Sequence, residues 1–202
     1  MARMTGPKNR LARKVGFDLN LKTNPMKLAR RLNIPPGMHG RKGKKKVTDY
    51  GEQLAEKQKV KYIYGVMEKQ FRKLYELATK TPASTGKVLL SLLERRLDNA
   101  VYRLGFAPTR AAARQMVVHG HVRINGKKLD ITSYTVRIND VVTLSETAVK
   151  IPAVAELLKD KGKVVPSWLE RKSSVGKIVR IPERDQIDAG INEQLIIEFY
   201  SR

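Results

Sequence analysis

The sequence of 202 residues predicts an α+β fold with a basic, extended N-terminal arm, a helical domain, and a module of two helices and a small antiparallel β-sheet. Three observations predict it. Residues 1–46 hold 14 of the 41 Lys and Arg residues and one acid, Asp18, so that +13 of the net charge of +22 lies in the arm. Apolar residues recur at helical spacing between residues 49 and 104. Further on, Asn125-Gly126 separates two short segments of strand character, which is typical of a β-hairpin.

Composition excludes several classes of protein. The chain has no Cys, which excludes disulfides and thiolate zinc sites and agrees with a reducing cytosol. No segment approaches the roughly 20 consecutive apolar residues that a membrane-spanning helix needs, and the basic N-terminus lacks the apolar core of a secretory signal. A positive charge of this size destabilises a compact chain by self-repulsion unless a polyanion binds, and nucleic acid is the usual polyanion.

The arm, residues 1–46, is expected to be mostly irregular. Gly6-Pro7, Asn24-Pro25 and Pro35-Pro36 interrupt any long helix, and only a short one, from Met26 to Leu32, is predicted. Apolar residues in the arm, among them Phe17, indicate that it docks on a partner. Without that partner we expect it to be largely disordered.

The helical domain is predicted to begin at Asp49, which would cap a helix with Glu52 three residues later. The residues Met67, Phe71, Leu74, Tyr75 and Ala78 then form one helical stripe. After a break at residues 81–85, the leucine-rich segment 89–104 is predicted to be helical up to a C-cap at Gly105.

The next segment predicts a helix followed by a hairpin. Thr109 is a suitable N-cap, and Ala113, Met116 and Val117 would form the buried face of a helix that ends at Gly120. Residues 122–124 alternate around the exposed Arg123, and residues 140–144 read as a further strand. Towards the C-terminus, residues 178–182 could form a short strand. The apolar segment 191–202 is expected to dock on the body of the protein, as either helix or strand.

Enzymatic motifs are absent or incomplete, so the chain is not expected to be an enzyme or to need a cofactor. Ser84-Thr85-Gly86-Lys87 lacks the first Gly and the final Ser or Thr of a P-loop. His119 and His121 have no third metal ligand nearby in the sequence, and no metal site is expected. Residues 96–98 are similar to part of the catalytic loop of pseudouridine synthases, but a side-chain pair between Arg95 and Asp98 within one helix is the simpler interpretation.

Basic side chains converge along the predicted helix and hairpin. Arg110 and Arg114 lie four residues apart, on a helix face that we expect to be exposed. They are joined by His121 and Arg123 on the strand and by Lys127 and Lys128 after the turn. Structured RNA is recognised largely through its shape, phosphates and 2′-hydroxyls, for which such a cluster suffices. For any single residue, ordinary solvated charge is an equally good interpretation.

Five segments of the chain are informative when taken together: MARMTGPKNRLARKVGFDLNLK (1–22), PPGMHG (35–40), DYGEQLAEKQKVKYIYGVMEKQFRKLYE (49–76), LLERRLDNAVYRLGFAPTRAAARQMVVHGHVRINGKK (92–128) and INEQLIIEFYSR (191–202). They closely resemble the S-four family of small-subunit ribosomal proteins from bacteria and organelles. Some members bind zinc through cysteines in the arm. Residues 8–32 contain none here, so zinc is not expected.

The resemblance implies a division of the chain: arm 1–46, first part of the helical domain 47–93, inserted RNA-binding module 94–158, and a C-terminal part 159–202 that completes the helical domain. It also implies a primary binder of small-subunit rRNA at a junction in the 5′ domain, which nucleates assembly of the body. The family further lines the channel through which messenger RNA enters, and contacts ribosomal protein S-five at an interface that affects translational accuracy. The expected location is the cytoplasmic ribosome, or the ribosome of an organelle.

From the resemblance and the charge pattern we expect two sets of RNA-binding residues. The residues expected to bind rRNA are Arg3, Lys8, Arg10, Arg13, Lys14, Lys22, Arg30, Arg31, Lys57, Lys59, Lys61, Arg72, Arg110, Arg114, His119, His121, Arg123, Lys127 and Lys128. Those expected to face messenger RNA are Arg41, Lys42, Lys44, Lys45 and Lys46. The alternatives are an RNA-modifying or RNA-charging enzyme that carries the same module, and a translational repressor that binds messenger RNA.

Overall fold

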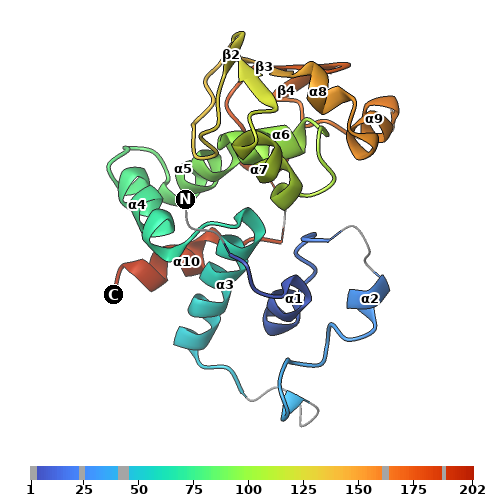
Figure 1. Ribbon diagram of the computed structural model, residues 1–202. Helices are drawn as coiled ribbons and strands as arrows, with labels where there is room; N and C mark the ends of the chain where they lie inside the picture. The colour runs from blue at the N-terminus through green and yellow to red at the C-terminus, as the bar shows by residue number, and fades with distance from the viewer. Residues whose placement is uncertain (1–3, 23–25, 41–45, 161–163, 188–189) are drawn as a thin grey trace. The chain divides into compact units, whose positions relative to one another are not determined.

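The computed structural model describes residues 4–22, 26–40, 46–160, 164–187 and 190–202 (Figure 1). The chain folds as two compact units, Met1–Gly86 with Ala189–Arg202, and Lys87–Asp188. Helices and an antiparallel sheet both occur, which confirms the predicted α+β class. Within the described ranges, no helix is both long and apolar enough to cross a lipid bilayer.

The first unit is helical. Its helices are α1 (Lys8–Val15), α2 (Met26–Ala29), α3 (Asp49–Tyr64), α4 (Glu68–Thr79) and α10 (Glu193–Tyr200), and α5 (Thr85–Glu94) begins at its end. The C-terminal helix α10 packs against α3 and buries Ile196. The prediction that the apolar chain end docks on the body is therefore confirmed, and the end is a helix. Helix α3 starts one residue earlier than expected, because the hydroxyl of Thr48, and not Asp49, caps it by accepting a hydrogen bond from the Gly51 N–H at 3.2 Å.

The arm contains a helix that the sequence analysis did not predict. Pro7 occupies the N-cap of α1 and so begins this helix instead of preventing it, and Gly16, with φ of 77°, ends it in the left-handed conformation. Helix α1 contacts α3, and Ala12 and Leu19 are buried. The expectation of an irregular segment is wrong for residues 8–15.

The second unit combines helices with one sheet. Its elements are the rest of α5, then α6 (Leu97–Arg103), α7 (Arg110–Val118), β1 (Val122–Ile124), β2 (Lys127–Lys128), β3 (Val141–Leu144), α8 (Glu146–Val149), α9 (Pro152–Lys159), β4 (Leu169–Lys172), β5 (Val175–Ile178) and the 3₁₀ turn η2 (Arg184–Gln186). The strands are antiparallel, in the order β2-β1-β3-β5-β4. Helices α6 and α7 pack together, and their apolar residues form one core with the buried face of the sheet and Trp168.

The sheet is larger than the sequence predicts. Strand β5 pairs with β3, so that residues 169–178, assigned above to the helical domain, belong to the sheet. The strand expected at 178–182 lies instead at Val175–Ile178, since β4 and β5 form a hairpin through Ser173, whose φ is 51°. Pairing between distant segments decides this arrangement, and local alternation does not reveal it.

The helical segment expected at 89–104 is two helices. The chain leaves helical geometry at Arg95 and Arg96, where the N–H of Leu97 donates to the Tyr134 carbonyl at 2.8 Å and the N–H of Val136 donates to the Arg95 carbonyl at 2.8 Å. Residues 134 and 136 thus provide backbone hydrogen bonds where a continuous helix would have made its own. Because Leu93 and Leu97 are both fully buried, the apolar pattern continues through the break.

The predicted start of α7 and the hairpin are confirmed. Thr109 caps α7 by accepting from the Ala112 N–H at 3.2 Å, and Ala113, Met116 and Val117 are buried. Asn125 and Gly126 have φ of 50° and 81°, as a type I′ turn requires.

Candidate nucleic-acid interface

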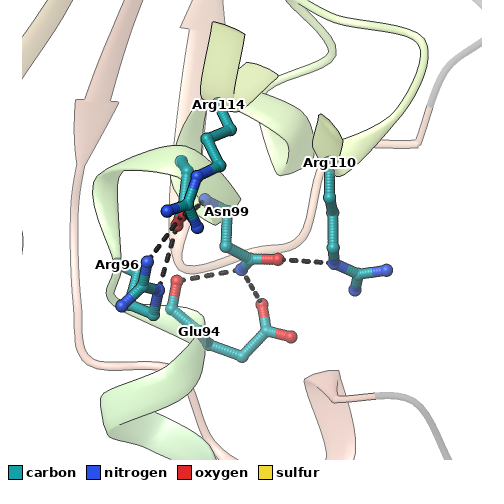
Figure 2. A network of polar contacts seen from close by, with 6 residues as sticks. Glu94, Arg96, Asn99, Arg110 and Arg114 are labelled. Carbon is teal, nitrogen blue, oxygen red and sulfur yellow. Dashed lines mark hydrogen bonds and ion pairs between the residues drawn. The ribbon is translucent and has the colours of Figure 1, made fainter. Parts of the chain in front are cut away.

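The two arginines of α7 lie in different surroundings (Figure 2). Arg114 faces Asp98 of α6, with Nη1 3.8 Å from Oδ2, and only 14% of its side chain is exposed. The same carboxylate accepts two hydrogen bonds from Arg96, from Nε at 3.1 Å and from Nη2 at 2.8 Å. The expectation that Arg114 lies on an exposed face is therefore wrong, since its guanidinium adds to a buried ion pair.

Asn99 lies at the centre of the neighbouring contacts. Its Nδ2 donates to the Glu94 carbonyl oxygen at 2.9 Å and to Glu94 Oε2 at 2.7 Å. The carboxylate of Glu94 is fully buried and also accepts a bidentate pair from Arg103, at 3.0 and 2.8 Å. A buried carboxylate needs such partners, because desolvation without them would be costly.

Arg110 is held by two residues of α6. Its Nε donates to Asn99 Oδ1 at 2.8 Å, and its guanidinium lies over the ring of Tyr102, with Cζ 4.7 Å from the centroid. Figure 2 shows the two terminal nitrogens pointing away from Asn99. Arg110 as a whole is only partly buried.

A group of basic side chains lies beside α7, on β1, β2 and the turn before them. Arg123 and Lys128 are directly opposite each other in the antiparallel pair and are both exposed. Lys128 lies across Gly120, where an added Cβ would collide with Lys128 Cε. The rings of His119 and His121, on either side of Gly120, are 6.2 Å apart. We call His119, His121, Arg123, Lys127 and Lys128 the hairpin cluster; Lys127 pairs with Ile124 and so lies on the other face of the hairpin from Arg123 and Lys128.

The lysines of α3 contact other residues of the same unit. Lys57 is 5% exposed, forms an ion pair with Glu68 at 2.8 Å and lies 4.1 Å from the centroid of the Phe199 ring. Lys59 is 9% exposed and contacts Glu56 and the Gly190 carbonyl. The ammonium groups of these two residues are thus enclosed by partners within the protein. Lys61 also pairs with Glu68, at 3.0 Å.

The partners of Glu68 lower the pKa of its carboxyl. Burial alone would raise its pKa, but hydrogen bonds from Lys57, Lys61 and Tyr200 lower the pKa to about 2. Burial and the hydrogen bond to Glu68 raise the pKa of Tyr200 above its ordinary value. These contacts connect α3, α4 and α10.

The remaining predicted residues differ in exposure. Arg13 donates to the carbonyls of Ile34 and Pro35 at 2.9 and 3.1 Å, and Lys8 donates to the Met4 carbonyl at 2.9 Å. Arg72 is exposed and pairs with Glu76. The other exposed cations of this set are Arg10, Lys14, Lys22, Arg30, Arg31 and Lys46. Arg3, Arg41, Lys42, Lys44 and Lys45 lie outside the described residues.

Asn99 and Tyr102, which contact Arg110, are not among the residues predicted from the sequence. Their spacing of three residues places both on one face of a helix, and this was readable in the sequence. That this face meets Arg110 depends on how α6 packs against α7. In the described parts of the chain, no group of three or more His, Asp or Glu side chains could hold a metal ion.

Comparison with known proteins identifies the family. Residues 3–94 match the ribosomal protein S4/S9 N-terminal domain, and residues 95–142 match the S4 domain. The chain is 50% identical over 206 residues to the small ribosomal subunit protein uS4 of Akkermansia muciniphila, and the match covers all of both chains.

The chain belongs to the uS4 family of small ribosomal subunit proteins. The uS4 proteins of Aquifex aeolicus and Parabacteroides distasonis are 48% and 47% identical to it, again over the full length of both chains. This confirms the resemblance found in the sequence. The S4 domain match includes α6, α7 and the β1–β2 hairpin. It therefore contains Arg110, the two residues of α6 that contact Arg110, and the hairpin cluster.

Proposed function

We propose that the hairpin cluster and Arg110 form a direct binding surface for small-subunit rRNA. The pairing of Arg123 with Lys128 carries this proposal. Like charges directly opposite each other on two strands destabilise a hairpin. Within the described residues, neither side chain has a carboxylate within 4.0 Å. A phosphate backbone would supply the missing negative charge.

Membership of the uS4 family supports this surface as part of a ribosomal protein. The protein is a structural constituent of the small ribosomal subunit and not an enzyme, and it resides in the ribosome in the cytoplasm. The finer assignment, to a junction in the 5′ domain whose binding nucleates assembly of the body, follows from the family resemblance, and we include it in the proposal.

Neutralising Arg123 and Lys128 tests the surface, because the affinity for RNA should fall while the stability of the free protein should not. Arg123→Gln with Lys128→Gln should weaken binding to a 5′-domain rRNA fragment and make the salt dependence of log K shallower by about 1.5 to 2. The same change should leave the stability of the protein without RNA unchanged or slightly raised, since a repulsion is removed. Lys73→Gln with Lys80→Gln, at two exposed positions, is the control of equal charge. Equal losses of affinity in both variants would show that only net charge matters.

The exposed cations of the arm extend the proposed surface. Truncating the arm would also remove the buried residues Ala12 and Leu19, so substitution is the cleaner test. Replacing Arg10, Lys14 and Lys22 by Gln should reduce the salt slope by about 2 and leave unfolding unchanged. Lys69, Lys73 and Lys80 changed to Gln form the matched control, and an equal reduction of slope there would remove the arm from the binding surface.

We also propose that the basic segment 41–46 holds messenger RNA as it enters the ribosome. The glycine-interrupted run of Arg41, Lys42, Lys44, Lys45 and Lys46 supports this, because such a run holds a moving strand by charge without fixed base contacts. Replacing the five residues by Ser should slow ribosomes at a stable hairpin in the message while subunit assembly stays normal. Unchanged transit together with weaker rRNA binding would assign the segment to the arm.

The family resemblance further supports an interface with ribosomal protein S-five that affects accuracy. We propose this contact for the present chain. Cross-linking of assembled subunits should recover the two proteins as neighbours, and recovery of S-five with other proteins alone would oppose it.

A further inference from the structure

We infer that the outer face of the five-stranded sheet binds the phosphate backbones of a double-helical segment of rRNA. The outer face is the side of the sheet turned away from the core, and its residues are Arg123, Lys128, Val141, Thr143, Glu170, Lys172, Val175 and Lys177. The inference rests on the proposed function, because it starts from RNA binding by Arg123 and Lys128. It extends that surface across β3, β5 and β4.

Strand pairing places one row of side chains across the whole sheet. Arg123 lies opposite Lys128 on one side and Thr143 on the other. Val175 is likewise paired with Thr143 and with Lys172. Directly paired residues point to the same side of a sheet, so these five side chains share one face. Neighbouring strands are about 4.8 Å apart, and the backbones that carry the two end lysines therefore lie roughly 19 Å apart.

A second row continues the same face. Lys177 lies opposite Val141 on β3 and opposite Glu170 on β4. The next residues along these strands, among them Val142 and Ile178, are buried in the core, on the side of the sheet where α6 and α7 lie (Figure 1). One face of an antiparallel sheet is often solvated, so exposure alone is ordinary. The charge of the outer face is the feature that indicates a ligand.

The cations of the outer face have no acidic partner within the described residues. Lys172 and Lys177 are exposed, and neither has a carboxylate oxygen within 4.0 Å, as is also true of Arg123 and Lys128. Glu170 is paired in register with Lys177 but does not come within that distance. The face therefore carries a clear excess of positive charge, which complements a polyanion.

The composition of the outer face favours a duplex over a single strand. Unpaired bases commonly stack on aromatic side chains, and none of the residues of this face is aromatic. The centre of the face holds the short side chains of Val141, Thr143 and Val175, with cations on the strands to both sides. Double-helical RNA is bound through phosphates and 2′-hydroxyls, which such a face contacts without reading bases.

Lys172→Gln with Lys177→Gln tests the part of the face that the proposed function does not include. The double variant should bind a 5′-domain rRNA fragment at least fivefold more weakly at about 0.1 M salt, and its salt slope should fall by about 1.5 to 2. Lys150→Gln with Lys159→Gln, at exposed positions of the same unit outside the face, is the control of equal charge. Lys172→Arg with Lys177→Arg keeps the charge and should bind like the wild type. Thermal unfolding without RNA checks that each variant is folded.

Glu170→Gln should have the opposite effect. Its carboxylate is the acid of the outer face and repels phosphate, so the substitution should raise affinity for the same fragment about threefold. Glu156→Gln, at an exposed position on α9, removes the same charge elsewhere and should raise affinity by less than about 1.5-fold. An equal gain in both variants would mean that only net charge matters, and would oppose the inference.

Cleavage from a single thiol tests whether the ligand is a duplex. The chain has no Cys, so Val175→Cys places one thiol at the centre of the outer face, where an iron chelate that generates hydroxyl radicals can be attached. In reconstituted small subunits it should cut both strands of one rRNA helix. The same chelate on Ala153→Cys, an exposed position of α9, should not produce these cuts. Cuts confined to an unpaired segment, or an absence of rRNA cuts from position 175, would overturn the inference.

Failure of the inference and failure of the proposed function give different results. If the Lys172/Lys177 variant matches its control while the Arg123/Lys128 variant still binds weakly, the RNA surface ends at the hairpin and the inference is overturned. If the Arg123/Lys128 variant alone matches its control, the proposed function fails instead, and the β4–β5 part of the outer face stands.

Discussion

Arg96 and Asp98 form a bidentate ion pair at the turn between α5 and α6, with Nε to Oδ1 at 3.1 Å and Nη2 to Oδ2 at 2.8 Å. Their side chains are only 4% and 6% exposed. The sequence predicts a pair between Arg95 and Asp98, but Arg95 donates to the Val136 carbonyl at 3.1 Å. Because the helix is broken here, Arg96 occupies the N-cap of α6 and reaches the carboxylate in the first turn.

Removing one member of this pair should be strongly destabilising. Asp98→Ala leaves two buried or nearly buried guanidinium groups, of Arg96 and Arg114, without their carboxylate, and should lower the free energy of unfolding by about 3 to 5 kcal/mol. Chemical denaturation measures this. The control is Glu76→Ala, which breaks the exposed Arg72–Glu76 pair and should cost less than about 1 kcal/mol. Similar losses in both variants would contradict the structural role of Asp98.

Arg114→Ala should affect stability, contrary to the expectation for an exposed residue. Its guanidinium is largely buried beside Asp98, so the substitution should lower the free energy of unfolding by more than about 1 kcal/mol. Arg123→Ala, at an exposed strand position, should change it by less than about 0.5 kcal/mol. Thermal unfolding without RNA distinguishes the two, and an unchanged melting temperature in Arg114→Ala would show that the ion pair contributes nothing.

Gly176 allows β5 to approach α6 closely. A Cβ at this position would lie 2.5 Å from both Cδ atoms of Leu104, a fully buried residue with little room to move. Gly176→Ala should therefore destabilise the protein by about 1 to 3 kcal/mol through overpacking. Gly6→Ala is the matched control, because nothing lies within 4 Å of its Cβ position. Stability in Gly176→Ala equal to that of the control would mean that the strand can shift without cost.

Glu68 should make the stability of the protein sensitive to acid. Its pKa is about 2 in the folded protein against an ordinary value of 4.5, chiefly because hydrogen bonds from Lys57, Lys61 and Tyr200 outweigh the opposing effect of burial. A lowered pKa stabilises the fold fully above pH 4.5, and this stabilisation is lost as the pH falls towards 2. The difference in unfolding free energy between wild type and Glu68→Gln should therefore shrink over that range. Glu76→Gln, on the same helix, corrects for the lost surface charge, and a constant difference for Glu68→Gln would contradict the prediction.

Local rules account for the parts of the fold that the sequence predicted correctly. The turn at Asn125-Gly126 follows from the need for positive φ at two successive residues, which few side chains tolerate. Thr109 caps α7 because its hydroxyl can reach a backbone N–H only three residues away. Each of these features is decided within a few residues, so the sequence alone was sufficient.

The sequence by itself also determined the charge of the protein and its family, since both depend on residue identity. Tertiary structure alone decided which cations are enclosed by other parts of the protein. Lys57 and Lys59 look like surface lysines in the sequence, but neighbours distant in the chain, Phe199 and Gly190, enclose them. Arg110 and Arg114 are equivalent by helical spacing, and become different only where α6 meets α7 with an amide opposite one and a carboxylate opposite the other. The reason is physical: the role of a charged group depends on its desolvation and its partners, and both are set by segments that only folding brings together.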